Sequence, residues 1–510
     1  MKTYRQYFLT LLLMFLFQPA ILWAAGEQDH ANLKFENYPD NCLNCHAEEA
    51  GEVHKSTHYQ WLGQAPDMTN GTHVLQGKLT NAVNSYCINI KGDWPVCGSC
   101  HAGRGKRPDD PTAGLENIDC LVCHNEQYAK ERKRLADGSM GVTTPTDSMV
   151  QNIQEPSRTN CLMCHAKAGG GDGVKRGDLS LALIDNTDEH FDVHMNTNDH
   201  DSDLACQECH TFKNHRVIGK GSDLRPTDDP TRGAELACTN CHSNEEIGKE
   251  HQSELKPHLA RVACQTCHIP FYAKVPTEIH REWLTHHDGS DATACTEQAP
   301  CPDHPYTVKA SNLVPEYKWW NRKSDNYLLF DDASRTFDEA KQTYPTSRPL
   351  GNVNDGKLYP FKYKTANQPM TIADNRLIAL DTLEYLKKSG NVNLSVEKGL
   401  LNMGYAANEP YSWVTTDTYQ LLNHGVEDSD TALRCNDCHG SSNRMNLKEK
   451  LGYQLKGEQT AVCNQCHEKE KIEPKDFKSM HKKHVSDKSN DCSWCHDFSR
   501  PERGLKMPEI

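Results

Sequence analysis

The chain has 510 residues, of which 36% are hydrophobic, and its formal net charge at pH 7 is −14. Even with its 32 glycines added, the apolar share stays below that of an average soluble domain, so we do not expect a large core built from protein side chains alone. The acidic balance, without any basic run, argues against nucleic acid as a partner.

The N-terminus has the pattern of a secretory signal. Lys2 and Arg5 precede an apolar run over residues 7–17, and two alanines close a predicted signal peptide over residues 1–25. The run is too short to span a membrane, and no other apolar stretch approaches that length. Removing the two cations leaves a net charge of −16, so we expect an acidic mature protein, periplasmic or secreted, with no membrane span.

Cysteine usage is the most specific signal in the chain. Of 23 cysteines, 20 form ten pairs spaced Cys-x-x-Cys, and a histidine follows each pair at once. Thiols at i and i+3 lie on one side of a helical turn, where they can add to the two vinyl groups of one haem while the histidine ligates its iron. Zinc half-sites and redox dithiols share the pair spacing, but ten repeats with the adjoining histidine, behind a signal peptide, favour ten covalently bound haem c groups. The motifs are Cys42, Cys45, His46; Cys97, Cys100, His101; Cys120, Cys123, His124; Cys161, Cys164, His165; Cys206, Cys209, His210; Cys238, Cys241, His242; Cys264, Cys267, His268; Cys435, Cys438, His439; Cys463, Cys466, His467; and Cys492, Cys495, His496.

Three cysteines lie outside these motifs. Cys295 and Cys301 are six residues apart in a proline-rich loop and could close a small disulfide in an oxidising compartment, an outcome that spacing alone leaves open. Cys87 is then an unpaired thiol, which is unusual in an exported protein and makes it a candidate functional residue.

Histidines are in surplus. Ten of the 27 belong to the motifs and 17 remain, enough to give every iron a second axial ligand. We predict distal ligands among the histidines near a motif, although a solvated histidine is the simple alternative for each. These candidates are His58, His194, His215, His258, His424, His481 and His484.

The motifs are unevenly distributed. Seven lie before residue 269, none lies in residues 269–434, and three follow. Leucines at every third position predict an amphipathic helix over residues 376–389, ended by Gly390. Strand signals are scarce, so the predicted fold class is mostly α with extensive irregular loops, a multihaem cytochrome c fold organised around ten covalent haems. The motif-free stretch is expected to pack around them.

A glycine-rich loop follows the fourth motif. Residues 169–173 contain four glycines, which let backbone pass close to a bulky group, and Lys175 follows them. The lysine could be delivered to an iron or to an anionic substrate. A flexible surface loop is the alternative.

Beyond the motifs, the chain resembles the octahaem tetrathionate reductase family of multihaem c-type cytochromes from about residue 41 to about residue 453. The motif order is similar, with seven motifs, a long gap and an eighth. The strings that carry the resemblance are Ser56–Trp61, Asn84–Ile88, Asp93–Gly103, Asp119–His124, Gly170–Lys175, Val262–Pro270, Pro360–Lys362 and Leu451–Tyr453.

The resemblance implies a specific catalytic site. In such proteins the second haem is catalytic and takes a lysine in place of a distal histidine. The matching positions are Cys97, Cys100 and His101 for this haem, Lys175 for its distal ligand, Asp172 for a nearby acid and Cys87 for a pocket thiol. The unpaired thiol and the glycine-rich loop thus meet at one predicted site.

The chain also departs from the family pattern. Arg176 stands where histidine is expected and would add local positive charge, residues 281–284 match loosely, and the tail adds two motifs. The predicted domains are the signal peptide, an octahaem cytochrome region over residues 26–455, and a C-terminal dihaem extension over residues 456–510 that relays electrons.

The expected function is electron transfer, with reduction of a small sulfur or nitrogen oxyanion such as tetrathionate or nitrite, or of hydroxylamine, at the lysine-ligated haem. The alternative is a non-catalytic electron conduit in which histidines ligate every iron. Expected partners are redox proteins, because an acidic surface suits docking to a basic one, although it could simply be solvated. A homo-oligomer is left open.

Overall fold

The computed structural model describes residues 30–70, 75–83, 85–86, 89–199, 202–219, 236–251, 256–352 and 355–434, and short stretches between residues 437 and 498. The predicted signal peptide lies outside the described residues, as do Cys87, Cys435, His439, Cys466 and Cys492. Among the helices in the described part of the chain, none is both long and apolar enough to cross a membrane.

Short helices and turns carry the first seven motifs. Side-chain caps start several of them: the Asn125 side chain accepts from the N–H of Tyr128 at the start of α7, and Ser157 and Asn160 form a capping box at α9. The α-helices are α3 (Asp40–His54), α4 (Thr57–Gln60), α5 (Trp94–Cys97), α6 (Leu121–His124), α7 (Glu126–Glu131), α8 (Ser148–Gln151), α9 (Arg158–His165), α10 (Cys206–Cys209), α11 (Asn244–Glu250), α12 (Lys256–Arg261) and α13 (Cys264–His268). The 3-10 turns are η1 (Phe35–Asn37), η2 (Ile90–Gly92), η3 (Gly98–Cys100), η4 (Leu115–Asn117), η5 (Leu181–Leu183) and η8 (Cys238–Asn240), and the small hairpins are β1 (Gly63–Gln64) with β2 (Leu75–Gln76), β3 (Lys133–Arg134) with β4 (Met140–Gly141), and β5 (Phe212–Lys213) with β6 (Arg216–Val217).

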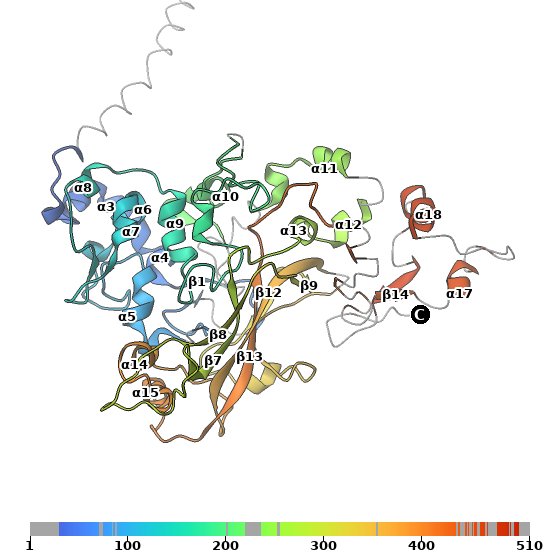
Figure 1. Ribbon diagram of the computed structural model, residues 1–510. Helices are drawn as coiled ribbons and strands as arrows, with labels where there is room; N and C mark the ends of the chain where they lie inside the picture. The colour runs from blue at the N-terminus through green and yellow to red at the C-terminus, as the bar shows by residue number, and fades with distance from the viewer. Residues whose placement is uncertain are drawn as a thin grey trace, which may run out of the picture.

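A seven-stranded mixed sheet occupies the motif-free stretch. Its order is β10-β11-β13-β12-β7-β8, and β9 also pairs with β12. The strands are β7 (Thr277–His286), β8 (Pro305–Ala310), β9 (Glu316–Trp320), β10 (Ser324–Asn326), β11 (Tyr344–Pro349), β12 (Lys357–Thr371) and β13 (Tyr411–Leu421). Figure 1 shows this sheet across the middle of the molecule, with most of the motif-bearing helices on one side of it.

The expectation of a mostly α fold is therefore wrong for this stretch. The central strand β12 contains Lys362, Lys364 and Gln368, all fully buried, so it lacks the alternation of apolar and polar residues by which a half-buried strand is recognised. The two lysine side chains contact loop carbonyls rather than solvent, as described below.

The predicted helix over residues 376–389 is only half helical. Its second part is α14 (Thr382–Lys387), which Asp381 caps by accepting from the N–H of Glu384. In its first part, Leu377 instead pairs with Met370 in an isolated antiparallel bridge. Residues 377–380 are buried on all sides, so their apolar character reflects burial and not a helical face.

Protein side chains do form a core of their own. The largest hydrophobic cluster joins the sheet to α14 and α15 (Val392–Met403) and contains Trp283, Tyr327, Tyr385 and Leu400, each at most 2% exposed. The Tyr385 hydroxyl donates to the carbonyl of Trp283 at 3.1 Å. The expectation that the chain lacks a large core built from protein side chains alone is wrong here.

A disulfide links Cys295 to Cys301, whose Cα atoms are 5.7 Å apart. Gly390 lies against it with φ of 75°, and a Cβ at this glycine would come within 2.2 Å of the carbonyl oxygen of Cys301. Gly390, the glycine predicted to end the helix, is thus required both by its positive φ and by its close contact with Cys301. The short turn η10 (Ala333–Thr336) completes this half of the molecule.

The described part of the tail consists of small elements. They are β14 (Tyr453–Leu455), α17 (Gln459–Asn464), α18 (Phe477–His481), the π-helical turn η11 (Lys482–Ser486) and β15 (His496–Phe498). β14 and β15 pair antiparallel, so the end of the tail returns to the segment just before it. Figure 1 shows α17, α18 and β14 at one edge of the molecule and α5 at the opposite side.

Candidate functional site

Four of the motifs show, within the described residues, the local turn that haem attachment needs. The histidine N–H donates to the carbonyl of the first cysteine, which closes one helical turn and sets the two thiols on the same side. These bonds join His124 to Cys120 at 3.1 Å, His210 to Cys206 at 2.8 Å, His242 to Cys238 at 2.9 Å and His467 to Cys463 at 3.0 Å.

Histidine rings from distant parts of the chain stand in pairs. A metal–imidazole bond is about 2 Å long, so two imidazoles that bind one iron from opposite sides have ring centres roughly 6 Å apart. Seven motif histidines have a second histidine with ring centres 5.9–6.4 Å away, and this donor set fits bis-histidine ligation of a haem iron. The pairs are His46 with His30, His165 with His58, His210 with His424, His242 with His194, His268 with His251, His467 with His484, and His496 with His481.

The protonation of these rings also fits a metal. The Nδ1 atoms of His210 and His251 contact the carbonyls of Ile218 and Ile247, each at 2.8 Å, which directs Nε2 outward. Burial lowers the pKa of His165 to about 3, with the neighbouring His58 adding to the effect. The neutral form, which is the form that binds metals, is therefore favoured.

Five of the seven predicted distal candidates occupy such a position: His58, His194, His424, His481 and His484. His215 lies close enough to His124 for its charge to lower the pKa of that motif histidine, after the larger effect of burial. His439, the histidine of the eighth motif, lies outside the described residues, so it cannot be compared with His258, and the role of His258 stays a prediction.

Sequence reasoning missed two paired histidines, His30 and His251. Each stands 12 or 13 residues before a motif cysteine, Cys42 and Cys264 respectively, so proximity to a motif was a usable signal. His30 lies just after the predicted signal peptide, where the chain is easily dismissed as a leader.

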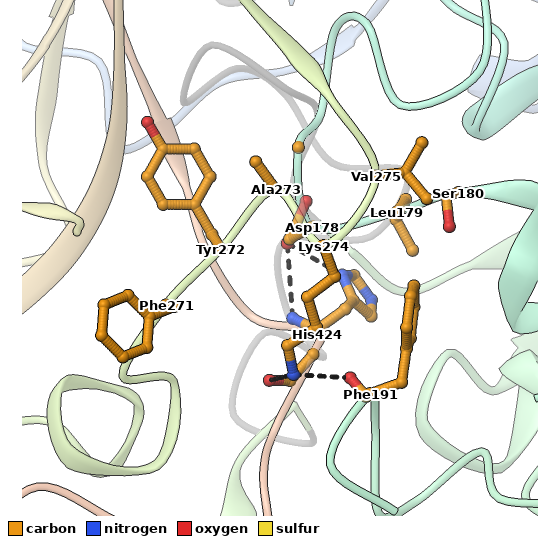
Figure 2. Close-up of a pocket in the computed structure, with 12 residues that line it drawn as sticks. Asp178, Leu179, Ser180, Phe191, Phe271, Tyr272, Ala273, Lys274, Val275 and His424 are labelled. Carbon is orange, nitrogen blue, oxygen red and sulfur yellow. Dashed lines mark hydrogen bonds and ion pairs between the residues drawn. The ribbon is translucent and has the colours of Figure 1, made fainter. Parts of the chain in front are cut away.

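Asp178 positions one of the distal candidates (Figure 2). Its Oδ2 accepts from Nδ1 of His424 at 3.0 Å, and Arg176 donates to both of its carboxylate oxygens at 3.0 Å. Burial opposes ionisation of Asp178, but Arg176 and His424 outweigh it and lower the pKa of the carboxyl group. A carboxylate that orients a histidine is a common support for a metal ligand. Arg176 is therefore neutralised by Asp178, which corrects the expectation that it adds free positive charge near Lys175.

The pocket beside His424 is lined by the rings of Phe191, Phe271 and Tyr272 and by Lys274. Lys274 Nζ donates to the carbonyl of Phe191 at 2.9 Å. The three aromatic rings give this pocket a partly apolar lining.

Lys175 lies where the glycine-rich loop meets the segment before Cys87. It is 4% exposed, and its Nζ is 5.5 Å from the ring centre of Tyr86. The Tyr86 hydroxyl donates to the carbonyl of Lys175 at 3.1 Å. Gly169 has φ of 87°, and a Cβ there would press on Lys175 at 3.1 Å and on Tyr86 at 3.2 Å. The glycine-rich loop is thus a packed element, and the alternative of a flexible surface loop is wrong.

The motif histidine of the predicted catalytic haem is enclosed by aromatic rings. His101 is 1% exposed, and the rings of Tyr59, Trp61 and Trp94 lie 4.9, 5.5 and 5.1 Å from its own. Burial lowers its pKa to about 4. Its Nε2 contacts the carbonyl of Tyr59, and within the described residues its buried Nδ1 has no hydrogen-bond partner.

Of the other two predicted site residues, Asp172 and Cys87, only Asp172 belongs to the described part of the chain. Asp172 is half-buried and its Oδ1 accepts from the N–H of Leu181 at 2.7 Å, so it caps the turn that follows the loop. Cys87 lies outside the described residues, although its neighbour Tyr86 is described. The approach of Lys175 to the iron held beside His101 stays a prediction.

Comparison with known proteins agrees with this geometry. The solved structure of octahaem cytochrome c from Shewanella oneidensis superimposes with a TM-score of 0.65 and 28% identity, over 81% of this chain and 92% of that one. The chain has the multihaem cytochrome c fold. A family model described as bacterial cytochrome c matches residues 279–442. An uncharacterised protein of Archaeoglobus fulgidus is 26% identical over 223 residues, which are 34% of this chain and 73% of that protein.

These findings confirm the resemblance expected from the motif strings. The cytochrome is a structural homologue of an octahaem protein, and the family model falls on the sheet and the eighth motif. The stretch without motifs is therefore an integral part of the cytochrome fold.

Attachment cysteines of different motifs touch one another in this cytochrome. Since each cysteine marks the edge of its haem, touching thiols mark neighbouring haem edges. The contacts join Cys42 to Cys120, Cys100 to Cys164, Cys161 to Cys206, and Cys238 to Cys264. Cys241 is close enough to Cys209 for its charge to raise the pKa of Cys209, after the larger effect of burial. In the same way, Cys438 and Cys267 both contribute to the raised pKa of Tyr317, which is mainly due to burial. Contacts and electrostatic interactions thus connect the attachment cysteines of the second, fourth, fifth, sixth and seventh motifs.

The sheet of the cytochrome holds the Lys175 loop through a buried lysine. Lys362 of β12 is fully buried and donates to the carbonyls of Val174 at 2.9 Å and Lys175 at 2.8 Å, and to the Thr277 hydroxyl at 2.5 Å. Burial, aided by the charge of Lys364, lowers the pKa of Lys362 well below its ordinary value. A lowered pKa favours the neutral amine, which still donates hydrogen bonds to the loop backbone.

A second buried group from the sheet holds the segments on both sides of Tyr86. Glu278 of β7 pairs with Lys364 at 2.6 Å and with Arg281 at 2.6 Å. Burial opposes its ionisation, but the charges of Lys364 and Arg281 prevail and lower its pKa. Lys364 donates to the carbonyl of Ser85, and Arg281 to those of Tyr86 and Gly169, at 2.7–2.9 Å.

Arg132 is a third buried cation, and it donates hydrogen bonds to the backbone of the second motif. Its side chain is 3% exposed, donates to Asp119 at 2.6 Å, and reaches three carbonyls around His101. These carbonyls belong to Ser99, His101 and Gly103, at 2.6–2.8 Å. Sequence reasoning missed Glu278, Arg281, Lys364 and Arg132, because nothing in their local pattern shows that a strand or loop will direct them inward.

Proposed function

We propose that the chain carries covalent haem c on each of its ten motifs, transfers electrons among them, and reduces a small sulfur or nitrogen compound at the second motif. The observation that carries the proposal is the burial of Lys175 against Tyr86, directly before Cys87, in loops that the sheet holds through buried lysine and arginine side chains. Bound haem supplies the electrons and an iron coordination position. Candidate substrates are tetrathionate, nitrite and hydroxylamine.

The charges near Tyr86 favour an anion. Lys175, Arg281 and Lys364 lie 5.5, 5.5 and 3.3 Å from its ring centre, and Glu278 is the carboxylate that pairs with two of them. A surplus of positive charge in a water-poor site strengthens attraction for an oxyanion. This local balance is opposite in sign to that of the whole chain.

Lys175, Cys87 and Asp172 are the proposed catalytic residues. A lysine amine binds a metal only when neutral, and once protonated it can hold an anion or donate a proton. Tetrathionate takes up two electrons as its central S–S bond breaks into two thiosulfates, and a thiol such as Cys87 can attack such a bond by exchange. Asp172 supports the loop through its contact with Leu181.

Lys175→His tests the catalytic proposal. We expect at least a ~10²-fold loss of tetrathionate, nitrite and hydroxylamine reduction with an artificial electron donor, because the exchangeable ligand and its proton are removed. The matched control is Lys167→His, an exposed lysine on the same connection, which should keep full activity. Turnover and the haem absorption spectrum are measured on both variants. Full activity in Lys175→His would move the active site elsewhere and leave electron conduction as the function.

Electron conduction is the second candidate, and the contacts between attachment cysteines of different motifs favour it. The two functions differ in the ligation of the iron at the second motif, because a pure conduit needs no lysine ligand there. We also propose that the protein is exported, and that it exchanges electrons with a redox partner protein at the surface.

A further inference from the structure

Two histidines on one helical segment of the tail face two different motif histidines. His484 lies opposite His467, with ring centres 5.9 Å apart, and His481 lies opposite His496 at 6.4 Å. Both spacings match two imidazoles on one iron, as for the pairs of the main body. The order is crossed, because the histidine later in the helical segment faces the motif that comes earlier.

The tail is folded so that this crossing can occur. α17, the next element after β14 in the described part of the tail, carries Cys463, and β15 begins at His496. In the antiparallel pairing of β14 with β15, His496 is the partner of Leu455. His496 therefore lies in the small sheet, and His467 comes shortly after α17 in the chain. The segment 477–486 brings one histidine ring opposite each of these two motif histidines.

The helical segment also orients its ligands. Nδ1 of His484 contacts the carbonyl of Met480 at 3.0 Å, which leaves Nε2 directed away from the backbone. The segment changes from α18 to the π-helical η11 directly after His481, and the N–H of Asp487 reaches the carbonyl of Lys482. A π-turn shifts the side chains that follow it around the helix axis, and such turns are common at functional sites.

We propose that the two tail haems form one unit in which segment 477–486 supplies both distal ligands, His484 to the iron of His467 and His481 to the iron of His496. Three residues of helix rise about 4.5 Å, so the two irons are held as close neighbours. The unit lies at the edge of the molecule opposite α5 (Figure 1), where electrons can enter or leave far from the second motif.

The surface charge of the tail fits such a terminal position. Residues 456–510 have eleven lysines and arginines against ten acidic residues, a net charge of +1, which leaves −15 for residues 1–455. Lys482, Lys483 and Lys488 are exposed beside the ligand-bearing turn. The tail thus differs in net charge from the acidic rest of the chain.

The ring orientations give a test that does not depend on activity. The imidazole planes are 84° apart in the His467–His484 pair and 24° apart in the His481–His496 pair. Ferric haems with perpendicular and with near-parallel imidazoles give different low-spin electron paramagnetic resonance signals. In the full-length haem-loaded protein, His484→Met should remove one signal of the perpendicular type, and His481→Met one of the near-parallel type. Each should raise the midpoint potential of one haem, since methionine ligation does so.

Lys483→Met is the matched control, because this exposed residue lies between the two ligands, and it should change neither signal. A second test removes the first tail haem by Cys463→Ser with Cys466→Ser. In that protein His484→Met should have no further spectral effect, while His481→Met should still convert one haem. The proposal is overturned if either histidine variant leaves every bis-histidine signal in place, or if each variant removes the signal assigned to the other.

Discussion

Glu278→Gln is expected to lower the free energy of unfolding by about 3–5 kcal/mol, because it leaves two buried cations without their carboxylate. Lys364 is fully buried and Arg281 is 7% exposed at the side chain, so water cannot replace the lost charge. Both cations also hold the backbone on either side of Tyr86. The loss should therefore extend to the Lys175 loop.

The measurement is denaturant unfolding followed by tryptophan fluorescence, which haem quenches in the folded protein. Glu339→Gln is the matched control, since Glu339 is exposed and its change should stay within about 0.5 kcal/mol. The absorption spectrum of the folded variant reports on ligation. Equal stabilities of the two variants would mean that the buried network does not support the site.

Arg132→Met should have a comparable effect on the second motif. It removes the buried partner of Asp119, a loss of about 3–5 kcal/mol for such pairs, and it frees the carbonyls around His101. Tyr38 and Tyr128 also donate to Asp119, at 2.8 and 3.1 Å, so the carboxylate keeps part of its support. Of the ten motifs, the second should show the largest change in ligation.

Arg107→Met provides the comparison, because Arg107 forms a surface pair with Asp109 and exposed pairs contribute little. Unfolding free energies of both variants and the mass of attached haem are measured together. If Arg132→Met unfolds like the wild type and keeps an unchanged spectrum, Arg132 is not a support of the second motif.

The sequence predicts the chemistry of this cytochrome better than its architecture. Cys-x-x-Cys-His is a local pattern, so each motif and its turn can be read without knowing the fold. Distal ligands are non-local, and nearness in sequence selects them only in part. His194, for example, lies just before the fifth motif but faces His242 of the sixth.

The sheet and its buried charges could not be predicted in this way. Lys362 and Lys364 read as solvent-facing residues, yet β12 directs both at loop carbonyls. Their partners come from segments roughly 190 and 280 residues away in sequence, which no periodicity reveals. The neighbouring glycines and the family resemblance both point to Lys175, and the structure adds the contacts that hold it in place.

Spectroscopic counting of iron ligation in the intact, oxidised protein tests the central claim most directly. Near-infrared magnetic circular dichroism separates histidine–histidine from lysine–histidine ligation, and intact mass gives the number of attached haems. The account predicts ten haems, nine of them ligated by two histidines and one by a histidine and a lysine, with the lysine signal lost in Lys175→Met. Ten haems that all show histidine–histidine ligation would contradict it.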